Sequence, residues 1–330
     1  MIRISRIAMI AALSVALPTA GRTAEVDALL PSETEQIVYM NVKQILGSDI
    51  IKKFALGQIK QTLEGNDAQK FLKEIGLDPM KDIDTVNIGV WGQDKDNMNT
   101  LAVVRGTFDA EKLFTAAEKA SKENADQVSI VEEGDYKLVK FVNKDGKPGY
   151  AAVADNKTVL IGSEKKIVAA SLTAAIKKVK PTLSKELAAL LLKQDAKASM
   201  FMCGVTEGKL KDIPDINVPL PGIEGDKLKE GLQKMNSVAV TINLGKEIAL
   251  DVTMGMKDAD AADDFGATMA KLTETVKNFL PLIGMQQPNA GELIKNISDT
   301  LNSKVKDKDI SLTLKITADS IGKATGKSDE

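Results

Sequence analysis

Short stretches in which apolar and polar residues alternate recur along this chain, and they constrain its fold more than any other feature. Residues 36–42 read QIVYMNV, and residues 237–244 read SVAVTINL. Alternation places every second side chain on one face of a β-strand, so each strand has an apolar face to bury. Strands of this kind form antiparallel sheets with one covered face. The sequence therefore predicts an α+β fold with mainly antiparallel sheets and helices packed on one face.

The predicted elements occur twice in the same order. TVNIGV, LAVVRG and the helical stretch DAEKLFTAAEK are followed later by SVAVTI, LDVTMGM and DADAADDFGATMAK. Asp109 is predicted to cap the first of these helices. The pattern predicts two strand-helix repeats, each with its own sheet. A charged stretch, KKVKPTLSK, lies between them and contains Pro181, as is typical of a linker. We therefore expect one repeat over residues 22–180 and a second over residues 181–330.

The first residues have the layout of a secretory signal peptide. Arg3 and Arg6 precede the apolar run at 7–17, which Pro18 and small residues end. The run is shorter than the roughly 20 residues that a membrane-spanning helix needs. We expect residues 1–21 to be removed and the mature chain to be periplasmic or secreted. No later stretch is long and apolar enough to predict a transmembrane span in the mature chain.

The composition excludes several classes of function. The chain has no His, which rules out a Ser-His-Asp triad, a Cys-His pair and a His-based zinc site. A formal net charge of −2 and 4% aromatic residues predict no nucleic-acid partner. The single Cys cannot form an internal disulfide, so the core alone must hold the fold. Ser-Lys or paired-carboxylate hydrolysis remains open.

Four segments resemble a known group of proteins. LLPSETEQIVYMNV, GLDPMKDIDTVNIGVWG, RGTFDAEKL and DNKTVLIGSEKKIVAAS are similar to segments of exported bacterial proteins, frequent in planctomycete-like bacteria, for which no activity is established. The resemblance is best over residues 29–200. It implies export and a strand-helix repeat, and it supplies no functional residue.

The stretch TVLIGSEKKIVAAS has the outline of a phosphate-binding loop, with a strand, a Gly and then a helix. A nucleotide-binding loop needs several glycines followed by Lys-Ser or Lys-Thr, and neither is present. We predict instead that Gly162 ends the strand and that Ser163 caps the helix. The alternative is an anion site at the helix N-terminus.

Several sulfur-containing side chains raise the possibility of a copper site. Met200 and Met202 share a strand face, as do Met254 and Met256, while Cys203 points away from Met202. Thioethers with a thiolate suit Cu(I). Met also fills irregular cores, and these positions belong to predicted strands. We predict core packing, no metal site and no cofactor.

Four acidic residues gather before the helix of the second repeat. Asp258, Asp260, Asp263 and Asp264 lack the spacing of a calcium-binding loop. Acidic residues at the start of a helix interact favourably with its dipole. We therefore predict that they cap a helix and have no catalytic role.

Two apolar segments that contain prolines are the predicted binding site. Residues 213–225 read IPDINVPLPGIEG and residues 278–288 read NFLPLIGMQQP, and both are expected to be irregular. Loops of this kind pack over a core or line a groove for an acyl chain, a peptide or a membrane surface. The predicted ligand-binding residues are Ile213, Ile216, Val218, Leu220, Ile223, Leu280, Leu282, Ile283 and Met285.

The sequence thus favours an exported, non-enzymatic protein that binds a hydrophobic ligand or an envelope partner. A first alternative is a structural envelope protein that associates with itself through exposed strand edges. A second alternative is a hydrolase, which would require a carboxylate or lysine with a perturbed pKa in a cleft.

Overall fold

A computed structural model describes residues 27–65, 69, 72, 73, 75–92, 98–143, 146–178, 182–218 and 220–326. The predicted signal peptide, residues 1–21, lies outside this part of the chain. So does the boundary expected at residues 180 and 181.

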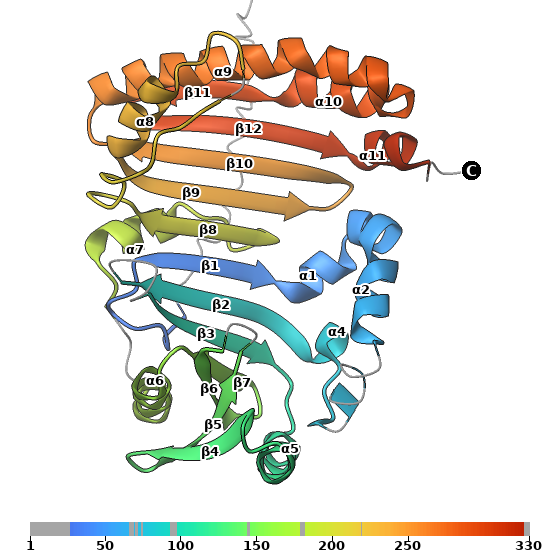
Figure 1. Cartoon of the computed structure of the whole chain (residues 1–330). Coiled ribbons are helices and arrows are strands. Elements are labelled where there is room, and N and C mark those ends of the chain that lie inside the picture. Colours follow the sequence, from blue (N-terminus) through green and yellow to red (C-terminus); the bar gives the residue numbers. More distant parts are fainter. Residues whose placement is uncertain are drawn as a thin grey trace, which may run out of the picture.

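The predicted α+β class is confirmed, because helices accompany a large antiparallel sheet (Figure 1). Within the described residues this sheet has twelve strands, all paired antiparallel. The strands are β1 (Gln36–Asn41), β2 (Ile83–Trp91), β3 (Asn99–Gly106), β4 (Val128–Glu133), β5 (Tyr136–Val142), β6 (Pro148–Asp155), β7 (Thr158–Gly162), β8 (Met200–Val205), β9 (Met235–Leu244), β10 (Glu247–Met256), β11 (Asn302–Lys306) and β12 (Asp309–Thr317).

A single sheet runs through both halves of the chain, where two sheets were expected. The strand order is β11-β12-β10-β9-β8-β1-β2-β3-β7-β6-β5-β4. The two halves join where β1 pairs with β8, with Val38 opposite Met202, and Figure 1 shows these strands side by side. Each opening strand would otherwise expose unpaired backbone N–H and C=O groups along one edge, and their pairing satisfies both edges.

Helices connect the strands and extend beyond the ends of the sheet. They are α1 (Val42–Gly47), the π-helical turn η1 (Ile51–Ala55), α2 (Leu56–Leu63), α4 (Pro79–Asp82), α5 (Ala110–Glu123), α6 (Lys165–Lys177), α7 (Lys185–Leu192), α8 (Gly225–Gln233), α9 (Ala259–Gln286), the 3₁₀ turn η2 (Pro288–Ala290), α10 (Gly291–Thr300) and α11 (Ala318–Thr325).

Both faces of the sheet carry helices. Neighbouring residues of a strand point to opposite faces. On β7, Leu160 is buried with Val168 of α6, whereas Val159 lines a cavity with residues of α5. In Figure 1, α5 and α6 accordingly lie on either side of the strands at the lower end. The expectation of helices on one face is therefore wrong, because apolar runs such as TVLIG have apolar side chains on both faces to bury.

One face, which we call the α6/α7 face, holds the larger core. This core combines side chains from both halves of the chain, so it crosses the expected boundary at residue 180. Its buried members are Leu29, Leu30, Ile37, Leu101, Val103, Leu138, Ala152, Leu160, Val168, Leu172, Leu183, Leu187, Leu191, Ala198, Phe201, Cys203 and Ala239.

The other face, which we call the α5/α9 face, holds a smaller core beneath α8 and α9. Met254 and Ile310 of the sheet pack there with Phe265 and Met269 of α9. Gly231 lets α8 approach α9 closely, because a Cβ at this position would overlap the Phe265 ring. This core belongs entirely to the second half of the chain.

A row of apolar side chains crosses the α5/α9 face from β4 to β12. The register places each member directly opposite the next, and we call this set the apolar row. Its members are Ile130, Val139, Ala151, Ile161, Ala102, Ile88, Val38, Met202, Val240, Val252 and Leu312.

Two of the predicted capping residues cap their helices, and a third does not. The side chains of Asp109 and Asp258 accept hydrogen bonds from the first turns of α5 and α9, which confirms both as caps. Ser163 does not cap α6. The helix begins one residue later, after Glu164, and the Ser163 hydroxyl accepts from the backbone N–H of Thr100, 3.1 Å away.

Candidate functional site

The first predicted ligand-binding segment, residues 213–225, packs mainly over the smaller core. Ile216, Val218 and Ile223 are half-buried against the core beneath α9. Ile213 and Leu220 are also half-buried. A Cβ at Gly222 would contact the Lys271 side chain, which places this segment beside the first half of α9.

The second predicted segment, residues 278–288, is not an irregular loop. Most of it belongs to α9, which contains Pro281 in its interior. Leu282, Ile283 and Met285 are exposed on the last turns of this helix, and Leu280 is half-buried. Ile283 lies twelve residues beyond Lys271, about 18 Å along a helix axis at 1.5 Å per residue. The described residues therefore do not bring the two segments together into one groove.

A cavity of about 430 Å³ lies instead between α5 and the strands at the other end of the sheet. Its walls come from one face of α5, from β4 to β7, and from one residue that precedes α4. The lining residues are Ile75, Ala110, Leu113, Phe114, Ala117, Ala120, Val128, Lys137, Val139, Phe141, Ala151, Ala152, Val153 and Val159.

Small residues on the facing elements leave this space unfilled. Ala117 and Ala120 of α5 face the strands across the cavity, and Ala151 of β6 lines the opposite wall. Gly149 of β6 does not add to this space, because the Phe141 ring lies where a Cβ of residue 149 would be. An apolar pocket of this size is a candidate site for a ligand.

The chemistry of the cavity is almost purely apolar. Thirteen of its fourteen lining residues are apolar, and Lys137 is the one charged residue among them. Lys137 lies on β5 close to the turn from β4, opposite Glu132 in the register. Such walls suit an apolar ligand, and this set contains no carboxylate or hydroxyl that could act as a general base or nucleophile.

Two further cavities have more polar walls. A cavity of about 390 Å³ between α8 and α9 includes Ile223, but six of its thirteen lining residues are charged. Another, of about 730 Å³ beside α1, α2 and α4, has six charged residues among fifteen. Because buried charges need partners, these walls favour contact with water over an apolar ligand.

The sulfur-containing residues do not form one site. Met200 and Met202 lie on β8, while Met254 and Met256 lie on β10, with β9 between the two strands. Two strand spacings amount to about 10 Å, too far apart for one metal ion to bind both pairs. Cys203 is fully buried on the opposite face, and burial raises the pKa of its thiol to about 12. Among the described residues, no group of three Cys, Asp or Glu could hold a metal ion.

The cavity was missed by reasoning from the sequence, although its helix was recognised. The apolar face Leu113, Phe114, Ala117 and Ala120 is visible in the stretch DAEKLFTAAEKA. Such a face is expected to pack against a sheet. The useful signal is the combination of alanines on this helix with the alanines in PGYAAVAD, because small residues on both sides leave a gap.

The fold and this cavity define an α+β protein with one extended antiparallel sheet and an apolar pocket beneath α5. Comparison of the chain with protein-family models, curated proteins and solved structures finds no match. Within the described residues, none of the helices combines the length and apolar character needed to cross a bilayer.

Proposed function

We propose that this chain is an exported, non-enzymatic protein that binds an apolar ligand in the cavity under α5. The observation that carries the proposal is the cavity itself, with a volume of about 430 Å³ and thirteen apolar residues among fourteen. Ligand sites in proteins typically have volumes of roughly 300–1,000 Å³ and mostly hydrophobic walls. The ligand is therefore a small molecule or a single hydrocarbon chain.

The position of Lys137 favours a ligand with an anionic head. Lys137 is the one charged residue among those lining the cavity, and it lies near the turn between β4 and β5. A lysine keeps its ammonium in water while its methylene stem lies along apolar surface. An acyl chain with an anionic head can thus place its tail in the cavity and its head beside Lys137. A fatty-acid-like ligand fits this arrangement best.

Export and internal duplication belong to the same proposal. Residues 1–21 are proposed to be a signal peptide, so that binding takes place in a periplasm or outside the cell. The two halves, 22–180 and 181–330, are proposed to be copies of one unit. The order β1-β2-β3 on one side of the junction and β8-β9-β10 on the other supports this proposal.

Titration with the fluorescent probe N-phenylnaphthylamine, followed by displacement with dodecanoate, tests the cavity. The variant Ala117→Phe fills part of the volume, and we expect it to weaken binding of both compounds at least about tenfold, or ~1.4 kcal/mol. Thr115→Phe adds the same ring on the exposed side of α5 and should bind as the wild type does. Lys137→Met should weaken binding of dodecanoate and leave binding of uncharged dodecanol unchanged.

Unchanged binding in Ala117→Phe would show that the ligand does not occupy this cavity. Equal effects of Lys137→Met on dodecanoate and dodecanol would remove the preference for an anionic head while leaving the cavity as the site. Circular dichroism of each variant checks that the helix and sheet content is retained.

A further inference from the structure

The apolar row continues from the cavity across the middle of the sheet. Ala151, which lines the cavity, lies opposite Ile161, and from there the row passes to β3, β2, β1, β8 and β9. At the far end it reaches Val252, which packs against the core beneath α9. Its two ends are thus covered by α5 and α9.

The middle of the row is exposed to solvent. Ile161 and Met202 are each 37% exposed. Their neighbours on the same strands, Leu160 and Cys203, point to the α6/α7 face and are 0% exposed. The strands are therefore buried on one face and open on the other, and of the helices that the structure describes none lies in front of the middle strands in Figure 1.

The open surface is wide as well as apolar. On β3, β2, β1, β8 and β9, the residues two positions before and after each member of the row are uncharged. Six strands about 4.8 Å apart and five residues about 3.4 Å apart give a surface from β7 to β9 of about 29 Å by 17 Å, or roughly 500 Å². A surface of this size matches the largest apolar patches on monomeric proteins, about 300–600 Å², which often mark interaction sites.

We propose that a second copy of this chain covers the surface, giving a dimer packed sheet against sheet. Two such surfaces bury about 1,000 Å² together, which is the lower limit for a specific interface. An uncharged surface can pack on itself about a two-fold axis. A single acyl chain would cover one row and leave the rows beside it in water. A second sheet, about 10 Å away, covers all of them.

This inference concerns a different surface from the ligand cavity and does not depend on the proposed function. Sedimentation velocity of the purified full chain over a dilution series tests it. We expect the wild type to sediment as a dimer. Met202→Glu places a charge in the middle of the surface and should reduce the measured mass to that of the monomer. Ile161→Glu, on the other side of β1, should have the same effect.

Ser311→Glu is the matched control. It places the same side chain on the α6/α7 face of β12, opposite Lys304, and should leave the dimer intact. Circular dichroism confirms that each variant is folded. The proposal is overturned by a wild type that is monomeric at every concentration, including a monomer that carries a bound lipid in native mass spectrometry. Dimers of folded Met202→Glu and Ile161→Glu would equally overturn it.

Discussion

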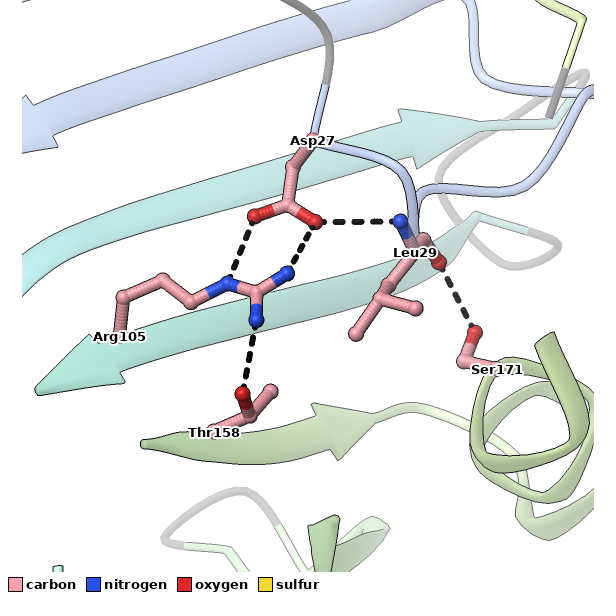
Figure 2. Close-up of polar contacts among 5 residues, drawn as sticks. All are labelled: Asp27, Leu29, Arg105, Thr158 and Ser171. Atoms are coloured by element: carbon pink, nitrogen blue, oxygen red, sulfur yellow. Dashed lines mark hydrogen bonds and ion pairs between the residues drawn. The ribbon is translucent and has the colours of Figure 1, made fainter. Parts of the chain in front are cut away.

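At the residue scale, a small group of polar side chains holds the first described residues against the sheet. The Arg105 guanidinium donates two hydrogen bonds to the Asp27 carboxylate, of 2.8 and 3.0 Å, and a third of 2.7 Å to the Thr158 hydroxyl (Figure 2). Asp27 also accepts from the backbone N–H of Leu29, whose carbonyl accepts from Ser171 of α6. This group thereby fixes Leu29 in the larger core.

Loss of the guanidinium should be costly, because the Asp27 side chain is only 7% exposed and would keep an unpaired charge. We expect Arg105→Met to lower the free energy of unfolding by about 2 kcal/mol. The loss is smaller than the ~3–5 kcal/mol for a fully buried pair, since Arg105 is itself partly in water. Urea denaturation measures the change.

The exposed ion pair of Lys315 with Glu247, 3.0 Å apart, provides the control. Lys315→Met should change stability by less than ~1 kcal/mol, as is usual for surface pairs. Equal losses in the two variants would mean that the Asp27–Arg105 pair contributes no more than a surface contact.

At the scale of elements, capping residues decide where helices begin when the cap and its helix are neighbours in sequence. Ser184 begins α7, and its hydroxyl accepts from the backbone N–H of Leu187 at 3.1 Å. Ser163 had an equally suitable position before α6 but is bonded to Thr100 of β3 instead. A side chain in a local capping motif can therefore accept its hydrogen bond from a distant strand instead of from the helix. Only the tertiary structure shows which backbone N–H is the donor.

Replacement of Ser184 by Ala tests the cap of α7. We expect the free energy of unfolding to fall by about 1 kcal/mol, because one backbone N–H of the first turn loses its acceptor. Thr182→Ala, at an exposed position just before the helix, should change it by less than ~0.5 kcal/mol. Thermal denaturation followed by circular dichroism compares the two, and similar losses would argue against a role for the cap.

At the scale of the whole molecule, one sheet and the larger core join the two halves of the chain. Leu187 of α7 belongs to the second half, yet it is buried in the same core as Leu101 and Leu160 of the first half. Trp91, the single Trp of the chain, packs against this core from β2. Its fluorescence therefore reports on the first half when the second half is changed.

We expect Leu187→Ala to lower the free energy of unfolding by about 3 kcal/mol, the usual effect of a cavity left by a buried Leu. The loss should appear equally in Trp91 fluorescence and in far-UV circular dichroism, as one cooperative transition. Leu192→Ala, exposed on the same helix, should have little effect. Two separate transitions, with the Trp91 signal unshifted, would show that the halves unfold independently.

Reasoning from the sequence succeeded where the determining interactions are local. The two-residue alternation predicted strands in stretches such as QIVYMNV, and Asp109 and Asp258 were recognised as caps from the helices that follow them. It failed at residues 278–288, where Pro281 suggested a loop. There the end of α9 packs on α10, with Gly284 next to the buried Ile294, and this tertiary contact outweighs the low helix propensity of proline.

The sequence by itself thus determined the α+β class and which residues of each strand share a face, because backbone geometry fixes a period of two. Only the tertiary structure decided that β1 joins β8, that both faces carry helices, and that a cavity remains under α5. These features depend on which segments far apart in the chain meet and on how completely their side chains fill the space between them. The alternation along one strand does not indicate which strand will pair with it, and it does not indicate how large the residues facing it will be.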